Sequence, residues 1–170
     1  DGGQVKSGEK LVEIDESDAQ SLYLKAKADI MDAKAEVEDA ERALLLSKDE
    51  LEAALKQSAL RETALSRQRD LQVRGVGTKA AVEAAELALS AAEQSVLNRR
   101  SSVDQAKARG ASAGTRLIRS QLALDDASRR LEDTKLFSKF DGVLSNITLV
   151  EGGIVTANER IGRLIDPNSL

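Results

Sequence analysis

A short segment near the middle of the chain carries the residues best suited to bind another molecule: Arg67, Leu71, Gly75, Val76 and Thr78. Arg67 and Leu71 are four positions apart, so they share one face of a helix. Gly75 can end that helix in a left-handed conformation, and the hydroxyl of Thr78 can cap the start of the next one. The surrounding surplus of Arg and Lys would suit carbonyl-rich helix ends or acidic side chains of a partner protein.

Other kinds of chemistry have little support in the composition. The chain has no Cys and no His, which removes disulfides, thiol catalysis and the usual zinc ligands. Its many carboxylates stand beside Lys and Arg on outward helix faces, the pattern of solvated charge. We therefore expect no catalytic residue, no cofactor, no metal site and no enzymatic activity. The net charge of -4 with interleaved signs also argues against nucleic acid as a partner.

The elements that position this segment are predicted to be two long helices. Hydrophobic residues make up 41% of the 170 positions but aromatic residues only 2%, and there is one Pro, which favours long helices packed through narrow seams. No apolar run is long enough to span a membrane. We therefore expect any membrane anchor or export signal to lie outside these residues.

Both helices show an apolar repeat of about 3.5 residues, which is typical of a coiled coil. In the first helix the inward positions are Ala19, Tyr23, Ala26, Ile30, Ala33, Val37, Ala40, Leu44, Ser47, Leu51, Ala54, Ser58, Arg61, Leu65, Gln68 and Gln72. In the second they are Val82, Ala85, Leu89, Ala92, Val96, Arg99, Val103, Ala106, Gly110, Ala113, Leu117, Ser120, Leu124, Ala127, Leu131 and Thr134. We expect Arg61 and Arg99 to extend from the edge of the seam into water.

The two registers agree with an antiparallel hairpin, in which the numbers of facing residues have a constant sum. Sums of 153 or 154 pair Leu65 with Leu89 and Leu44 with Gly110, for example. Each arm of about 55 residues would then be roughly 80 Å long at the rise of an α-helix. The first helix is predicted to begin with a capping box formed by Ser17 and Gln20.

Two glycines, Gly110 and Gly114, interrupt the second helix, where each costs about 0.5–1 kcal/mol relative to Ala. One interpretation is close approach of a neighbouring subunit or a flexible point in the arm. The other is that Gly110 only makes room for Leu44.

The ends of the chain have strand and turn patterns and repeat each other. Residues 2–11 match residues 152–161 at a fixed offset of 150, with Gly8 and Asn158 both suited to a left-handed turn. The chain therefore carries two copies of a strand-turn-strand unit that can pair into one small β-sandwich. A further strand, Val143 to Val150, precedes the second copy, and its counterpart is expected before Asp1.

These flanking motifs resemble the split lipoyl-like domain of the HlyD or membrane fusion protein family, the periplasmic adaptor subunits. The matching motifs are Val5-x-x-Gly8-x-x-Leu11-x-x-Ile14-Asp15 and Leu131-x-x-Thr134-x-Leu136-x-Ser138-x-x-Asp141-Gly142-x-Leu144. The Pro that usually precedes Asp-Gly in the family is absent, since Ser138-Lys139-Phe140 stands there.

The resemblance implies an α+β fold in which a long antiparallel coiled-coil hairpin is inserted between the halves of a small all-β lipoyl-like (barrel-sandwich hybrid) domain. Residues 1–16 and 135–170 would form the β domain, with its N-terminal part incomplete. Residues 17–134 would form the hairpin, with its tip near 74–78. A lipoyl or biotinyl carrier is disfavoured because the hairpin replaces the turn that would present the modified Lys.

The resemblance also assigns a role to the tip. Adaptors that dock onto a TolC-type duct share an Arg-x3-Leu-x6-Ser signature, and Arg67, Leu71 and Thr78 stand at that spacing, with Thr in place of Ser. It implies a periplasmic adaptor for efflux or secretion, attached to the inner membrane through parts outside this chain. The adaptor would link an inner-membrane transporter, of the resistance-nodulation-division (RND) or ABC type, to a TolC-type outer-membrane channel. Its hairpin tip would dock onto the channel, and six adaptors would form a ring. A structural coiled-coil or oligomerisation protein without a transport partner is the alternative, although it does not explain the repeated end units.

Overall fold

The computed structural model describes residues 3–156 and 159–166. Its elements in chain order are β1 (Gly3–Val5), β2 (Lys10–Glu13), α1 (Ser17–Val73), α2 (Lys79–Glu132), β3 (Lys135–Phe137), β4 (Gly142–Ser145) and β5 (Arg163–Ile165). The chain divides into two compact units, one of Lys27–Ala123 and one that joins Asp1–Ala26 to Leu124–Leu170. The predicted fold class, a helical hairpin flanked by short antiparallel strands, is confirmed.

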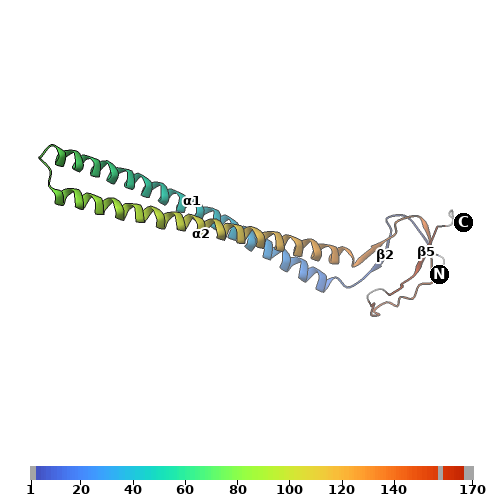
Figure 1. The fold of residues 1–170 in the computed structure, drawn as a ribbon. Helices are drawn as coiled ribbons and strands as arrows, with labels where there is room; N and C mark the ends of the chain where they lie inside the picture. Colours follow the sequence, from blue (N-terminus) through green and yellow to red (C-terminus); the bar gives the residue numbers. More distant parts are fainter. Residues whose placement is uncertain (1–2, 157–158, 167–170) are drawn as a thin grey trace. The chain divides into compact units, whose positions relative to one another are not determined.

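The first of these units is an antiparallel hairpin in which α1 and α2 run side by side to a single turn (Figure 1). Ion pairs between the helices are Arg69–Glu86, Glu50–Arg99 and Glu36–Arg116, with N–O distances of 2.8, 2.8 and 2.7 Å. The residue numbers of these pairs add up to 155, 149 and 152. These sums lie close to the predicted 153 or 154. Small differences are expected, because long Arg and Glu side chains can reach across the seam to a residue that is not directly opposite.

The apolar core of the hairpin follows the predicted seam. Every buried apolar side chain in the described part of the chain stands at a seam position: Ala26, Ile30, Ala33, Leu65, Val82, Ala92, Val96, Val103, Ala106 and Ala127. Arg61 and Arg99 are exposed, as expected for the edge of a seam. At the distal end the prediction is wrong for Gln72, which is exposed, because Leu71 is the half-buried residue there.

The start of α1 is capped differently from the prediction. The carboxylate Oδ1 of Asp15 accepts hydrogen bonds from the amide and the hydroxyl of Ser17, at 2.9 and 2.5 Å. Both bonds lower the pKa of Asp15, and the bond from the hydroxyl contributes more than the bond from the amide. Ser17 is the first residue of α1, and its hydroxyl donates to Asp15 instead of accepting a hydrogen bond from an amide of the helix. The expected Ser17–Gln20 capping box is therefore incorrect, because the nearby carboxylate is the stronger acceptor.

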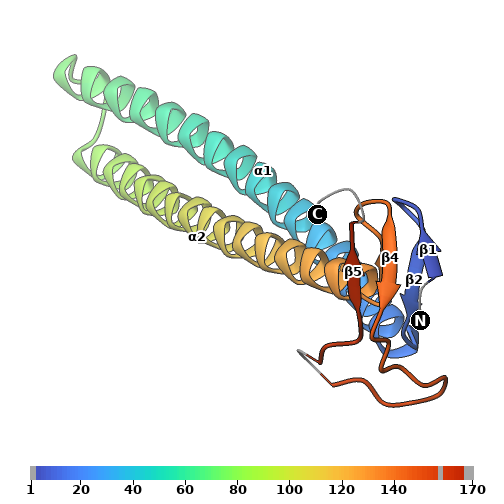
Figure 2. The same cartoon turned by 90° about the vertical axis from the view of Figure 1, so that its right-hand side faces the viewer.

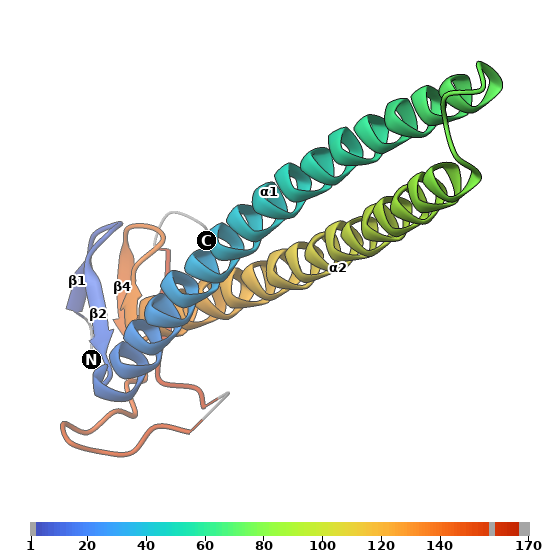
Figure 3. The same ribbon diagram turned by 90° about the vertical axis from the view of Figure 1, so that its left-hand side faces the viewer.

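The strands belong to the other unit and form two small antiparallel sheets. One sheet has the order β1-β4-β5 and the other pairs β2 with β3. Figure 2 shows β4 between β1 and β5, and Figure 3 shows β1 and β4 from the opposite side. In the three-stranded sheet Leu144 faces Gly3 on one side and Leu164 on the other. Strands from both ends of the sequence thus share each sheet.

Hydrogen bonds from backbone amides also join the first segment of the chain to the last. Ser7 N donates to Asp141 Oδ1 at 2.6 Å, and Gly8 N donates to the Ser138 carbonyl at 2.8 Å. Ile14 N donates to the carbonyl of Thr134, also at 2.8 Å. Thr134, Ser138 and Asp141 belong to the motif quoted above, and the side chain of Asp141 makes its contact directly. The buried hydroxyls of Thr134 and Ser138 donate to the carbonyls of Leu131 and Phe140, at 2.7 and 2.5 Å.

Gly142, which follows Asp141 in that motif, is required for a steric reason. A Cβ at this position would lie 2.6 Å from the carbonyl oxygen of Ile165 on the neighbouring strand β5. Only a residue without a side chain allows the two strands to come this close.

The second copy of the repeat is less regular than predicted. The expected strand Val143–Val150 is interrupted at Asn146, whose φ of 52° is left-handed, so only its first part belongs to β4. Residues 153–155, the counterpart of β1, form no strand. Gly8 has the expected left-handed φ of 84°. Its partner Asn158 lies outside the described residues.

Neither α1 nor α2 contains a stretch that is apolar enough to cross a membrane, within the residues the structure describes.

Candidate functional site at the hairpin tip

The turn between the helices begins with a Schellman motif. Gly75 has a φ of 76°, and its N–H donates to the Gln72 carbonyl at 3.0 Å. Val76 N donates to the Leu71 carbonyl at 3.1 Å, which completes the motif. The predicted role of Gly75 as a left-handed cap is therefore confirmed. The carbonyls of Leu71 and Gln72, near the end of α1, are thus satisfied by the turn itself.

Gly77 is a further essential residue of the turn that was not among the predicted site residues. Its N–H also donates to the Leu71 carbonyl, at 3.0 Å. A Cβ here would lie 2.6 Å from the backbone nitrogen of Gln72 and 2.9 Å from the carbonyl carbon of Leu71. The chain therefore folds back against its own helix end, where only Gly fits. The local sequence carries no signal for this constraint, because it arises from backbone atoms of Leu71 and Gln72 at the end of α1.

Thr78 caps the second helix, as its position predicted. Its Oγ1 accepts a hydrogen bond from the N–H of Ala81 at 3.2 Å, three residues into the next turn. The Thr78 carbonyl accepts from Ala81 and Val82, at 3.1 and 3.3 Å. A hydroxyl engaged in this way has a structural role whether or not a partner binds.

The side chains of the tip differ in accessibility. Val76 is 75% exposed, and Val73, which was not predicted as a site residue, is 88% exposed. Arg67 is also exposed, whereas Leu71 is half-buried. Leu71 therefore contributes its carbonyl to the turn and only part of its side chain to the surface. The two valines are the apolar groups that another protein could cover.

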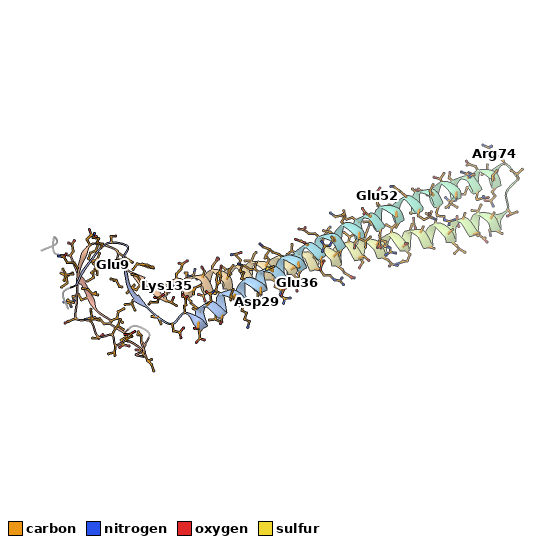
Figure 4. All side chains as sticks on the ribbon, turned by 180° about the vertical axis from the view of Figure 1, so that it is seen from behind. Glu9, Asp29, Glu36, Glu52, Arg74 and Lys135 are labelled. Carbon is orange, nitrogen blue, oxygen red and sulfur yellow. The ribbon has the colours of Figure 1, made fainter. Side chains whose placement is uncertain are left out.

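Charges at the tip are partly neutralised within the hairpin. Arg69 pairs with Glu86 at 2.8 Å, and Lys79 lies 3.4 Å from Glu83. Arg67 and Arg74 make no ion pair with any residue in the described ranges, and Figure 4 labels Arg74 at the end of α1. Among the described residues of the tip, the guanidinium groups of Arg67 and Arg74 are thus left for an external acceptor.

A surface groove lies beside Arg67. Its volume is about 460 Å³, and it is lined by Glu62, Thr63, Ser66, Arg67 and Asp70 of α1. No group of three or more acidic, His or Cys side chains that could hold a metal ion occurs in residues 3–156 and 159–166. The tip as described is suited to contact through apolar, guanidinium and backbone groups.

A second hollow lies halfway along the hairpin, with a volume of about 600 Å³. It is lined by Glu36, Asp39, Ala40, Ala43, Ala108, Arg109, Ser112, Ala113 and Arg116. A Cβ added at Gly110 or Gly114 would meet no atom within 4 Å. The interpretation that Gly110 makes room for Leu44 is therefore wrong, because the space beside Gly110 is open.

No family model matches the chain, and no curated protein matches it. One similar solved structure is that of the periplasmic adaptor protein EmrA, at 19% identity and a TM-score of 0.46, covering 99% of this chain and 67% of that chain. Another is MacA from Actinobacillus actinomycetemcomitans, at 20% identity and a TM-score of 0.36, covering 96% of this chain and 42% of that chain. The chain therefore spans about two thirds of EmrA and less than half of MacA.

Proposed function

We propose that this chain is the hairpin and lipoyl-like part of a non-enzymatic periplasmic adaptor of the membrane fusion protein type. The tip binds the end of a TolC-type outer-membrane channel, and the adaptor connects that channel to an inner-membrane transporter of the RND or ABC type for efflux or secretion. Several copies, six in the family pattern, surround the transport path. Attachment to the inner membrane comes from parts outside these residues.

The observation that carries this proposal is the construction of the tip. Two helices of 57 and 54 residues end in a turn whose backbone is satisfied by Gly75, Gly77 and Thr78, so the turn needs no partner to form. It nevertheless presents Val73 and Val76 at exposures of 88% and 75%. Rigid apolar groups beside free cations are typical of a binding surface, because little ordering is required on contact.

The partner surface follows from the same side chains. Arg67 and Arg74 require carboxylates or exposed carbonyl oxygens, and the valines require a shallow apolar contact. The ends of helical hairpins offer both kinds of group, because the last carbonyls of a helix carry partial negative charge. We therefore assign the contact to helix ends of the channel.

The test is site-specific crosslinking in the full-length protein with its channel. Because residues 1–170 contain no Cys, single Cys variants at Leu71 and Val76 place one thiol each in this region. We expect a channel adduct from Val76→Cys and a weaker one from Leu71→Cys, since the side chain of Leu71 is half-buried. The matched control is Leu45→Cys, which is 62% exposed but lies in the middle of α1.

Normal expression of Val76→Cys without any channel adduct would contradict the docking proposal. Equal adducts from Val76→Cys and Leu45→Cys would also contradict it, because contact would then not be specific to the tip. Adducts only between copies of this chain would favour the alternative, a structural coiled-coil or oligomerisation protein without a transport partner.

A further inference from the structure

The hollow halfway along the hairpin, with a volume of about 600 Å³, marks one face of the paired helices. Alanine side chains from both helices form part of its lining. Charged groups line it as well, and they are Glu36 and Asp39 on α1 and Arg109 and Arg116 on α2 (Figure 4 labels Glu36). One helix thus contributes carboxylates to the hollow, and the other contributes guanidinium groups.

This separation of charge extends along both helices. Residues seven positions apart lie on the same side of a coiled-coil helix, so the face can be followed in heptad steps from the residues that line the hollow. Within residues 27–60 of α1, the steps from Glu36 and Asp39 reach only acidic charges: Asp29, Asp32, Glu36, Asp39 and Glu50. Within residues 91–123 of α2, the steps from Ser112 and Arg116 reach only basic charges: Arg109, Arg116 and Arg119. We call this surface the polarised face.

The face on the other side of the seam has no such separation. It carries the ion pair between Arg69 and Glu86. Heptad steps from Arg69 reach both Lys34 and Glu41 on α1, and steps from Glu86 reach Arg100 on α2. A partner that recognises separated charges is therefore expected on the polarised face alone.

The polarised face also carries exposed apolar side chains. Leu46 and Leu60 follow Asp39 in heptad steps and are 61% and 66% exposed. The corresponding steps on α2 reach no large apolar residue, because Gln105 and Ala91 stand there. Large side chains on one helix and smaller or polar ones on the other can interdigitate when two such faces meet.

A second copy of the chain matches this face in one orientation. Residues of α1 and α2 at the same level on the face have numbers that add up to 151: Asp32 with Arg119, Asp39 with Ser112, Leu46 with Gln105, and Leu60 with Ala91. About a two-fold axis parallel to the helices, α1 of each copy lies over α2 of the other, so each of these pairs forms twice between the copies. A two-fold axis across the helices would instead place α1 on α1, where the carboxylates repel each other.

We propose that two copies of this chain pair through the polarised face into a parallel four-helix bundle. Asp32 of each copy lies beside Arg119 of the other, and each Leu60 packs on Ala91 of the other. The same face of both copies is used, so the contact is closed at two copies, unlike the repeating contact between different faces in a ring. This inference does not depend on the proposed transport function.

The first test is crosslinking between two differently tagged forms of the full-length protein, each with a single Cys. Residues 1–170 contain no Cys, and any Cys elsewhere is replaced by Ser. With a short bis-maleimide, Leu46→Cys mixed with Gln105→Cys should give a mixed adduct. The matched control is Leu45→Cys mixed with Gln105→Cys, which should give severalfold less. Leu45 and Leu46 are neighbours with exposures of 62% and 61%, but about 100° of helix rotation separates their side chains.

Charge reversal gives a second readout. Neither Asp32 nor Arg119 has an ion pair within residues 3–156 and 159–166, so reversal should leave the hairpin itself intact. Asp32→Arg and Arg119→Asp should each weaken the dimer by roughly tenfold, because each creates two like-charge contacts per dimer. The double variant should restore it. Lys34→Glu, a reversal on the other face, is the control and should have no effect. Sedimentation equilibrium at low salt measures the dissociation constants.

Four outcomes would overturn the proposal. The absence of a mixed adduct from Leu46→Cys and Gln105→Cys would exclude the contact. Equal adducts from Leu45→Cys would show that association is not specific to the polarised face. Adducts of Leu46→Cys with itself that exceed the mixed adduct would place α1 on α1. A double charge variant as weak as the single ones would exclude direct pairing of the two residues. None of these measurements involves the channel, so they do not test the tip contact.

Discussion

At the scale of single residues, the tip is held by backbone contacts that leave little choice of side chain. Gly75 has a left-handed φ, Gly77 lies against the backbone of α1, and Thr78 caps α2. The roles of Gly75 and Thr78 could be predicted, because caps depend on local sequence. The role of Gly77 could not be predicted, because its φ is not left-handed and its constraint comes from backbone atoms five and six residues earlier.

Gly77→Ala should destabilise the hairpin by about 1–3 kcal/mol, because its Cβ cannot lie 2.6 Å from the Gln72 nitrogen without moving the backbone. The measurement is the free energy of unfolding in urea, followed by circular dichroism. Gly75→Asn is the control, since Asn tolerates the left-handed region and should cost less. An Ala variant as stable as the unmodified chain would show that the turn can relax.

Thr78→Ala should lower the free energy of unfolding by about 1 kcal/mol, whereas Thr78→Ser should change it by only a few tenths. The reason is that Ser keeps the oxygen that accepts from Ala81. The same urea experiment compares the two variants. If both are as stable as the unmodified chain, the hydroxyl is not needed as a cap, and its place in the tip would have to be explained by binding alone.

Asp15 should make the start of α1 sensitive to acid. Its pKa lies below the ordinary value of 3.8 because the hydroxyl and the amide of Ser17 donate to the charged carboxylate. A lowered pKa in the folded state means that the stabilisation is present above pH 3.8 and is lost as the pH falls through the lower, folded value. The difference in free energy of unfolding between the unmodified chain and Asp15→Asn, measured in urea, should therefore decrease as the pH falls below 3.8. An advantage independent of pH would contradict this assignment.

At the scale of elements, the helices were easier to predict than the strands. A seam repeated over more than 50 residues averages out local irregularities, so residues as distant as Ile30 and Val103 were placed correctly in the core. The strands contain three or four residues each, and their limits depend on partners remote in sequence. Asn146 illustrates the difference, because its left-handed conformation ends a strand that the β-branched pattern extends to Val150.

Gly110→Ala and Gly114→Ala should each raise the free energy of unfolding by about 0.5–1 kcal/mol, because Ala restricts the unfolded chain and the added Cβ contacts nothing within 4 Å. Thermal and urea unfolding measure the change. Gly142→Ala provides the opposite control, since its Cβ would lie 2.6 Å from the Ile165 carbonyl and should destabilise the sheet. A lower free energy of unfolding in Gly110→Ala or Gly114→Ala would contradict this prediction. It would mean that the fold of this chain requires a glycine at that position.

At the scale of the whole molecule, the order of contacts along the sequence sets the order of folding. The hairpin can close from its turn outward through local contacts, whereas Ser7 and Asp141, which join the ends of the chain, are 134 residues apart. Non-local contacts are reached late because their loop entropy must be overcome first. The β strands should therefore form after the helices have paired.

Asp141→Ala should speed the unfolding of the β strands and leave the rate of helix formation nearly unchanged, as expected for a contact absent from the transition state. Stopped-flow circular dichroism reports the helices, and pulsed hydrogen exchange at residues 3–5 and 142–145 reports the strands. Asp141→Asn, which keeps an oxygen to accept from Ser7, should have a smaller effect. A slower rate of helix formation in Asp141→Ala would place the contact in the folding nucleus.

Because the registers of α1 and α2 match, the hairpin can be shortened by whole heptads. Removing seven residues from each arm, at positions that face each other, keeps every remaining seam residue on its inward side and shortens the hairpin by about 10 Å. Removing them from one arm alone would slide the two seams past each other. The length of the hairpin and the structure of its turn can therefore change independently, because the first depends on the number of paired heptads and the second on the few residues around Gly75.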